Sequence, residues 1–134
     1  MQSIRKAFLV PCLFALAVLA GQAVADEILP PEKTGGVDLG DPEVIRKGSE
    51  ILFTTCGGYC HGSDAGGFKG PPLRARPDLE IKGLYAVINF GRKRAGKIMP
   101  AWKGTLTDEQ IWSVIAAIVS LRTAEPSAVK RESH

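Results

Sequence analysis

Apolar residues recur at helical spacing in three separate stretches of the chain. The first stretch predicts a helix over residues 42–54. Asp41 can cap its first turn, Pro42 suits the first helical position, and the carboxylate of Glu43 favours the positive end of the helix dipole. The apolar positions of this helix are Val44, Ile45, Ile51 and Leu52, with Gly48 between them.

The other two stretches predict one short helix and one longer helix. The short helix is expected over residues 78–89 and ends before Gly91. The longer helix begins at Thr107, which can pair with Gln110 in a capping box, and it runs to about Arg122. Its apolar face is broad and is formed by Ile111, Trp112, Ile115, Ile118 and Leu121.

Glycine and proline are frequent between the predicted helices. Residues 61–77 and 91–105 are therefore expected to be loops. No stretch shows the alternation of apolar and polar residues that is typical of a strand, so the predicted fold class is all-α.

Small residues on two of the predicted helices indicate a close crossing. Gly48 lies near the middle of the first helix, and Ala116 and Ala117 lie near the middle of the last. Small side chains at a contact let two helix backbones approach closely, with Phe53 and Trp112 filling the flanks. We therefore expect the first and last helices to cross at these positions.

The first 25 residues have the parts of an export signal. Arg5 and Lys6 precede an apolar run over residues 7–20, and the Ala-Val-Ala sequence at 23–25 matches the pattern that signal peptidase cleaves. The apolar run is shorter than the roughly 20 residues that a membrane-spanning helix needs. We expect residues 1–25 to be a cleaved signal peptide, and an uncleaved anchor is the alternative.

Removal of the signal would leave one small domain. Residues 26–40 are expected to be a flexible lead-in, residues 41–122 the folded domain and residues 123–134 a disordered tail. The formal net charge of the whole chain is +3, and the loss of Arg5 and Lys6 would lower it by two. So small a net charge favours neither nucleic acid nor a membrane surface as a partner, and no stable membrane insertion is expected after cleavage.

The stretch T-T-C-G-G-Y-C-H-G at residues 54–62 carries the most distinctive chemistry of the chain. Cys56 and Cys60 could form a disulfide in an oxidising compartment, but a disulfide does not require the histidine that follows the second cysteine. A structural zinc ion needs four donors, and beyond Cys56, Cys60 and His61 the exported chain offers only His134. The third interpretation is a c-type haem, whose usual attachment motif has two residues between the cysteines rather than three.

The haem interpretation uses all three residues of the motif. Cys56 and Cys60 would form thioether bonds to the porphyrin, and the imidazole of His61 would bind the iron as its proximal ligand. The extra residue of the motif would be absorbed by Gly57 and Gly58, because glycine can adopt positive φ.

A sixth ligand would suit the iron to electron transfer. Met99 is the only methionine after residue 25, and it lies just before the last predicted helix. Its thioether is a soft donor, and ligation by methionine and histidine raises the reduction potential of a haem.

Further motifs accompany the C-H-G step at residues 60–62. They are G-P-P-L at 70–73, M-P-A-W at 99–102 and the L-T-D-E-Q-I-W start of the last helix. With these motifs, over about residues 48–121, the chain resembles the class I c-type cytochromes, the small monohaem electron carriers of bacterial periplasms and mitochondria. The resemblance implies a small all-α cytochrome c fold with three to four helices wrapped around one covalently attached haem c, and with crossing N- and C-terminal helices.

The resemblance also implies roles for individual residues. Cys56 and Cys60 would attach the haem, while His61 and Met99 would bind its iron. The carbonyl of Pro71 would accept the proton on the far nitrogen of His61 and so hold the imidazole in one orientation. Three further side chains would pack around the ring, namely Leu73, Ile98 and Trp102.

The chain departs from the family's pattern in three places. Its attachment motif has one residue more than usual between the cysteines. Counted from Gly48, Phe53 stands one position later than the family's aromatic residue. Ala117 occupies a position where the family often has an aromatic side chain.

The resemblance implies a monomeric one-electron carrier of the periplasm rather than an enzyme. Small exported cytochromes serve respiratory complexes, terminal oxidases and dehydrogenases, and by analogy we expect a periplasmic dehydrogenase, such as a quinoprotein alcohol dehydrogenase, to be the donor. Two alternatives stay open. One is a haem enzyme or gas-binding haem protein in which Met99 is a labile ligand, and the other is a haem-free disulfide or metal-binding module.

Basic residues gather around the predicted ligand Met99. Residues 81–103 contain six basic residues and no acidic residue. A positive rim of this kind would speed the encounter with an acidic redox partner and would make the rate fall with added salt. The six residues are Lys82, Arg92, Lys93, Arg94, Lys97 and Lys103.

Overall fold

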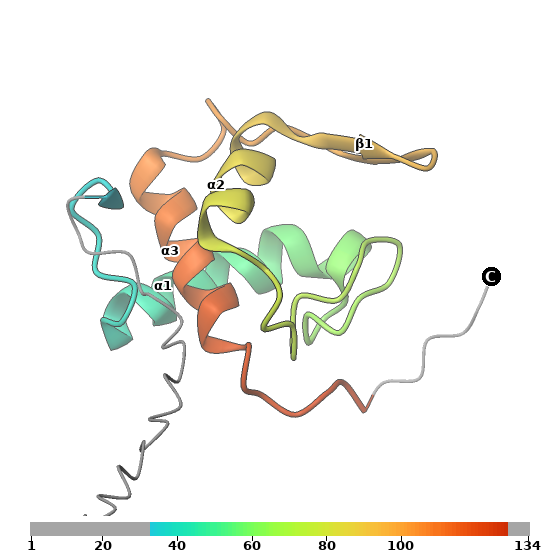
Figure 1. Cartoon of the computed structure of the whole chain (residues 1–134), viewed down its shortest axis with the longest axis horizontal. Coiled ribbons are helices and arrows are strands. Elements are labelled where there is room, and N and C mark those ends of the chain that lie inside the picture. The colour runs from blue at the N-terminus through green and yellow to red at the C-terminus, as the bar shows by residue number, and fades with distance from the viewer. Residues whose placement is uncertain (1–32, 129–134) are drawn as a thin grey trace, which may run out of the picture.

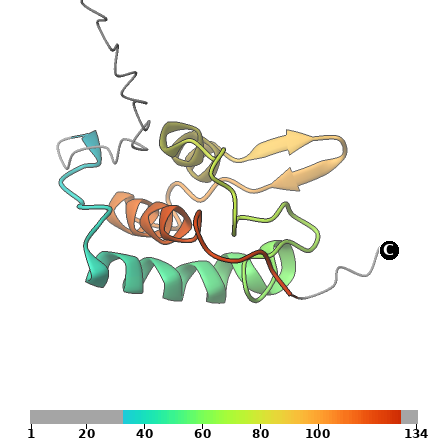
Figure 2. The same ribbon diagram turned by 60° about the horizontal axis from the view of Figure 1, so that its bottom comes forward.

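The computed structural model describes residues 33–128, and the predicted signal peptide and residues 129–134 lie outside this range. Figures 1 and 2 show α3 lying between α1 on one side and α2 on the other, with the hairpin of β1 and β2 extending from the end of α2. Within the described range, no helix has the length and apolar character needed to cross a membrane. The elements are α1 (Pro42–Ile51), η2 (Leu52–His61), α2 (Ile81–Phe90), β1 (Arg92–Arg94), β2 (Lys97–Met99) and α3 (Asp108–Ser120).

The predicted helix starts are confirmed for α1 and α3. The Asp41 carboxylate accepts hydrogen bonds from the backbone amides of Glu43 at 2.7 Å and Val44 at 3.3 Å, and α1 begins with proline. At α3 the Thr107 hydroxyl accepts from the Gln110 amide, and the Gln110 side chain accepts from the Thr107 amide. These caps satisfy amides that have no partner inside a helix, so both starts follow from local sequence.

The other predicted boundaries need correction. The helix expected over 42–54 leaves α-helical geometry at Ile51, and the chain continues as the π-helix η2 through His61. The helix expected over 78–89 begins only at Ile81, because Arg76 and Asp78 are bonded to each other at 2.6 Å within a turn that precedes it. Pro77 lies inside this turn and favours it over a helix.

The segment expected to be a loop at 91–105 contains a β-hairpin. Arg92 pairs with Met99, Lys93 with Ile98 and Arg94 with Lys97. Ala95 and Gly96 connect the strands and both have positive φ, at 47° and 76°, as the central residues of a type I′ turn do. The prediction that this segment has no strand was therefore wrong.

The first and last helices cross at Gly48, as predicted. Gly48 is buried against the backbone of Ser113 and Val114 of α3, whereas the predicted contact with Ala116 and Ala117 is displaced by one turn of α3. Gly48 has no side chain, so the helix backbones can meet there.

Trp112 packs against α2. Its ring stacks on Tyr85 with centroids 4.4 Å apart and an interplanar angle of 17°. The side chain of Trp112 therefore links α3 to α2, in addition to any role at the flank of the helix crossing.

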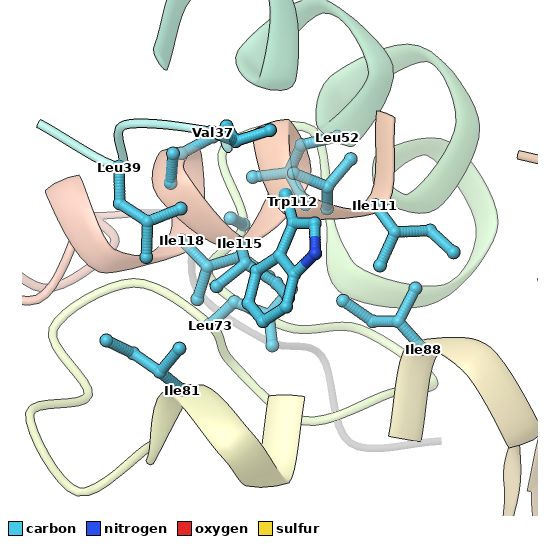
Figure 3. Packing of buried hydrophobic residues seen from close by; sticks show 14 residues of the cluster. Val37, Leu39, Leu52, Leu73, Ile81, Ile88, Ile111, Trp112, Ile115 and Ile118 are labelled. Atoms are coloured by element: carbon cyan, nitrogen blue, oxygen red, sulfur yellow. The ribbon is translucent and has the colours of Figure 1, made fainter. Parts of the chain in front are cut away.

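The core surrounds α3 and also draws residues from the segment before α1, from η2, from the loop after η2 and from α2 (Figure 3). Val37 and Leu39 belong to this core, although residues 26–40 were expected to be a flexible lead-in. That expectation is wrong for residues 33–40, because the apolar side chains in this glycine-rich segment find partners on the folded helices. The labelled core residues in Figure 3 are Val37, Leu39, Leu52, Leu73, Ile81, Ile88, Ile111, Trp112, Ile115 and Ile118.

The segment after α3 also has fixed contacts. The amide of Ala75 donates to the carbonyl of Leu121 at 2.9 Å, and the hydroxyl of Ser127 donates to the carboxylate of Asp64 at 2.5 Å. Residues 123–128 were expected to belong to a disordered tail, and the bond of Ser127 instead holds this segment against the loop that follows η2.

Candidate functional site

The three residues of the cysteine motif lie on one element, and the predicted sixth ligand lies on another. Cys56, Cys60 and His61 belong to η2, and Met99 ends β2. Both views place the far end of η2 and the hairpin at the same end of the molecule (Figures 1 and 2). The fold thus brings the two predicted halves of the site to one end of the helical core.

The imidazole of His61 is buried and oriented. Only 6% of the residue is exposed, and its Nδ1 lies 2.8 Å from the carbonyl oxygen of Pro71. A carbonyl can only accept a hydrogen bond, so Nδ1 carries a proton, and in the neutral ring the lone pair is then on Nε2. This is the contact with Pro71 that the resemblance implied, while the role of His61 as an iron ligand stays a prediction.

The backbone around His61 is bonded to the loop that follows it. The carbonyl of His61 accepts from the amide of Gly67 at 2.7 Å, and the carbonyl of Cys60 accepts from the amide of Gly70 at 2.7 Å. Gly62 turns the chain with a φ of 82°, a conformation that suits glycine. These bonds satisfy carbonyls at the end of η2 and fix the position of its last turn.

Cys56 and Cys60 are half-buried free thiols in this structure. Burial raises the pKa of Cys56, and the negative charge that Cys60 can carry raises it further. A raised pKa keeps the thiol of Cys56 protonated, which is the opposite of the lowered pKa typical of reactive cysteines. The chain context is a helix before the motif and a loop after it, rather than the strand and helix that flank a redox-active thiol pair.

The remaining predicted site residues differ in burial. Met99 and Trp102 are half-buried and pack against the core, and Leu73 belongs to the core itself, with 7% exposed. Ile98 is 69% exposed. The amide of Trp102 donates to the carbonyl of Ile88 at 2.9 Å, which ties the chain after the hairpin to the end of α2.

Three exposed aromatic residues near these elements were missed by the sequence reasoning. Tyr59 lies within the cysteine motif, Phe68 in the loop after it, and Phe90 at the end of α2. Lys69 lies over the ring of Tyr59, and Lys103 lies over the ring of Phe90 at 5.5 Å. The position of Tyr59 between the cysteines was a signal that could have drawn attention to it.

The donor set fits a c-type haem. Two thiols, an imidazole with a free Nε2 and a thioether sulfur are the groups that attach and ligate such a haem. Within residues 33–128, no group of three histidine, cysteine, aspartate or glutamate side chains comes together as a metal-ion site would need, so the zinc interpretation gains no support there.

Comparisons with known proteins point in the same direction. A family model described as cytochrome c oxidase, cbb3-type, subunit III matches residues 43–116. The structure is similar to that of cytochrome cL from the marine methylotrophic bacterium Methylophaga aminisulfidivorans MPT, with 29% identity and a TM-score of 0.54 over 67% of this chain and 61% of that one. It is also similar to the c-type cytochrome NirC, with 23% identity and a TM-score of 0.48 over 60% of this chain and 93% of that one. The chain therefore spans about three fifths of the length of the cytochrome cL that it matches.

Proposed function

Because the chain belongs to the family of cytochrome c domains described as cytochrome c oxidase, cbb3-type, subunit III, we propose that it is a periplasmic one-electron carrier with one haem c attached covalently at the cysteine motif of residues 56–61. The observation that carries this proposal is the buried His61 ring, which follows Cys60 directly in η2 and whose Nδ1 donates to Pro71, so that Nδ1 is not the nitrogen left for a metal. Family membership supports haem binding and electron transport. The similarity to cytochrome cL, at 29% identity, supports the cytochrome c-like fold.

The residues of the chain would set the properties of the site. Haem iron, when bound, supplies one-electron redox chemistry whose potential depends on its axial ligands. The Pro71 carbonyl holds His61 in a single tautomer and orientation. Met99 would supply a thioether, which favours a high potential, and Leu73 and Trp102 would exclude water from this region.

Two protein ligands would make the site an electron carrier rather than a catalytic or gas-binding centre. His61 and Met99 would together supply two protein ligands to the iron, and both would have to stay bound to keep a substrate or a gas from it. The alternative of a labile Met99 draws on one observation, the position of Met99 on a hairpin of two three-residue strands. Isolated hairpins of this size are marginally stable.

The hairpin also supports docking to an acidic redox partner. The hairpin carries four exposed cations, and none of them takes part in the ion pairs found within residues 33–128. These hairpin cations are Arg92, Lys93, Arg94 and Lys97. Since side chains alternate along a strand and paired residues share a face, Arg92, Arg94 and Lys97 share a face with Met99. Lys82 on α2 and Lys103 after the hairpin are exposed as well.

The partner that this surface would suit has an acidic rim around an apolar centre. Phe90 and Ile98 are 68% and 69% exposed, next to or among the hairpin cations. Interfaces of this kind combine charge, which speeds encounter, with a small apolar contact. A periplasmic dehydrogenase, such as a quinoprotein alcohol dehydrogenase, is the donor that we propose.

The experiment that tests the function is a potentiometric titration of protein exported from a host with haem-attachment machinery. We expect one haem, a one-electron transition and no binding of carbon monoxide to the reduced protein. Met99→Ala should lower the midpoint potential and admit carbon monoxide, because it removes one of the two proposed protein ligands. Carbon monoxide binding to the unaltered protein would favour the gas-binding alternative, and a colourless protein would favour the haem-free one.

A further inference from the structure

The extra residue of the attachment motif lies within a π-helix. The segment Leu52–His61 forms i→i+5 hydrogen-bonded turns, whereas α1 before it forms i→i+4 turns. The backbone is helical on both sides of the junction, with φ and ψ of −64° and −44° at Ile51 and −56° and −49° at Leu52. The change from α to π geometry therefore occurs without a break in the helix.

A π-turn has one residue more than an α-turn. In the usual motif the second cysteine is the fourth residue of an α-turn that begins at the first cysteine, and the histidine is the fifth. In this chain Cys60 and His61 are the fifth and sixth residues counted from Cys56, and His61 closes a π-turn that begins at Cys56. The π-turn thus gives Cys56, Cys60 and His61 the same places within one helical turn that an α-turn gives the usual motif.

The start of the π-helix is held by the core. Gly48 is buried against α3, and Leu52, four residues later on the same face, is 1% exposed. Leu52 rather than Phe53 therefore occupies the buried position after Gly48, and Cys56 follows Leu52 by four residues. The packing of Gly48 and Leu52 therefore fixes the position of Cys56 from the N-terminal side of the motif.

The end of the π-helix is held by the loop that follows it. The carbonyls of Cys60 and His61 accept from Gly70 and Gly67, and the His61 ring donates to Pro71. Because both ends are held, the additional residue must be taken up between Cys56 and Cys60.

The two glycines of the motif take part in different ways. Neither Gly57 nor Gly58 has positive φ, so the expectation that they would absorb the extra residue in this conformation is wrong. Gly57 is buried, and a Cβ on it would lie 3.0 Å from the carbonyl oxygen of Gly62. A Cβ on Gly58 would meet nothing within 4 Å. Gly58 is also exposed, so it is the glycine of the motif at which a change of the turn disturbs no buried packing.

From this geometry we infer that the π-turn compensates for the third intervening residue, so that Cys56 and Cys60 both form thioether bonds to one haem. The inference rests on the proposed haem attachment. In each attachment the thiol adds across one vinyl double bond: the sulfur bonds to the carbon next to the ring, and the thiol hydrogen goes to the terminal carbon. Nothing is oxidised and nothing is released.

The test counts thiols in the exported holoprotein. The protein is denatured and treated with iodoacetamide, its intact mass is measured, and its pyridine haemochrome spectrum is recorded. We expect the mass of one haem, no alkylation and an α band at the position of two saturated vinyl groups. One haem with one alkylated thiol would overturn the inference and leave the proposed function standing. A protein with no haem and two alkylated thiols would overturn the proposed function and this inference with it.

Variants of the turn provide matched controls. Cys56→Ser and Cys60→Ser should each shift the α band to the single-thioether position, which calibrates the measurement. Deletion of Gly58 should convert the π-turn to an α-turn and keep both thioethers, and Gly58→Ala should change nothing. Insertion of a second glycine beside Gly58 should leave one thiol open to alkylation, because a π-turn compensates for one residue only. Two thioethers in the deletion variant and one in the unaltered chain would also overturn the inference.

Discussion

Gly48 meets the backbone of Ser113 so closely that a Cβ added to it would lie 1.7 Å from the Ser113 carbonyl oxygen and 2.3 Å from the Ser113 carbonyl carbon. Neither atom can move without moving α3, whose central residues are buried on all sides. The crossing of α1 and α3 therefore depends on glycine at this one position. Since η2 continues directly from α1, the crossing also determines where the cysteine motif starts.

Replacement of Gly48 by alanine should separate the two helices. We expect Gly48→Ala to lower the free energy of unfolding by about 3 kcal/mol, the upper part of the usual range for overpacking. Gly83→Ala is the matched control, because Gly83 lies on α2 with nothing within 4 Å of an added Cβ. That variant should gain about 0.8 kcal/mol from its higher helix propensity. Denaturant unfolding measures both, and equal effects would contradict the close crossing.

A carboxylate connects α2 to the start of α3. The Asp108 side chain accepts a hydrogen bond from the Tyr85 hydroxyl at 2.6 Å and another from the Trp112 indole at 3.2 Å. The bond to Asp108 raises the pKa of Tyr85, with smaller contributions from burial and from the carboxylate charge. A raised pKa means that folding favours the protonated phenol.

This bond predicts a loss of stability at alkaline pH. The contribution of Tyr85 is complete below pH of about 10, the pKa of a free tyrosine, and is lost as the pH rises through the higher pKa of the folded protein. Tyr85→Phe should cost about 1 kcal/mol near neutral pH, and the difference from the unaltered protein should narrow above pH of about 10. Tyr59→Phe is the control, since Tyr59 is 69% exposed and its hydroxyl accepts a hydrogen bond from Lys69 instead of donating one to a carboxylate. A difference for Tyr85→Phe that does not change with pH would contradict the assignment.

The hairpin turn carries a residue that is poorly suited to its conformation. Ala95 has a φ of 47°, a left-handed conformation that asparagine and glycine adopt more readily than alanine. Ala95→Asn should stabilise the hairpin by about 1 kcal/mol, which slows the hydrogen exchange of its paired amides about five-fold. Ala86→Asn on the exposed side of α2 should instead destabilise its helix by about 0.6 kcal/mol. Unchanged exchange in Ala95→Asn would mean that the turn does not limit hairpin opening.

Local signals were sufficient to predict parts of this fold. The caps at Asp41 and Thr107 involve residues three or fewer positions apart, so each can be recognised from its own segment. The hairpin could not be recognised, because its strands are short and basic and its turn is Ala-Gly rather than Asn-Gly. The core positions of Val37 and Leu39 depend on helices distant in sequence, and composition alone suggested a loop there.

The site shows the same division between local and distant information. The residue types at Cys56, Cys60 and His61 identify the chemistry, because their order in the chain is itself the motif. The π-turn that holds them could not be predicted, since the spacing shows that one residue is added but not how the backbone absorbs it. The hydrogen bond between His61 and Pro71 was implied only by the family resemblance.

The loop beside His61 leaves little room for a side chain at Gly70. A Cβ there would lie 3.1 Å from Cε1 of His61 and 3.2 Å from the carbonyl oxygen of Cys60. Gly70→Ala should therefore turn the imidazole and weaken the bond between Gly70 and Cys60, at a cost of about 1 kcal/mol. The electron paramagnetic resonance spectrum of the oxidised protein reports the ligand orientation and should change. Gly58→Ala, which meets nothing, should leave the spectrum as it is.

The last prediction distinguishes the effect of the cations on the hairpin from the effect of the net charge of the protein. Arg94 and Lys97 are directly opposite each other on the hairpin that carries Met99. Lys47 lies on α1, which α3 separates from α2 and the hairpin, and Lys33 lies at the start of the described chain, at the end of the molecule away from the hairpin (Figure 2). Replacing either pair by glutamine removes two positive charges.

If the hairpin directs docking, the Arg94 and Lys97 variant should react about five-fold more slowly with an anionic iron complex at low salt, and faster with a cationic cobalt complex. The Lys33 and Lys47 variant should change much less, and equal changes in both variants would show that net charge rather than the hairpin sets the rate. Stopped-flow kinetics over a range of ionic strength measures this, and the difference between the variants should shrink as salt screens the hairpin.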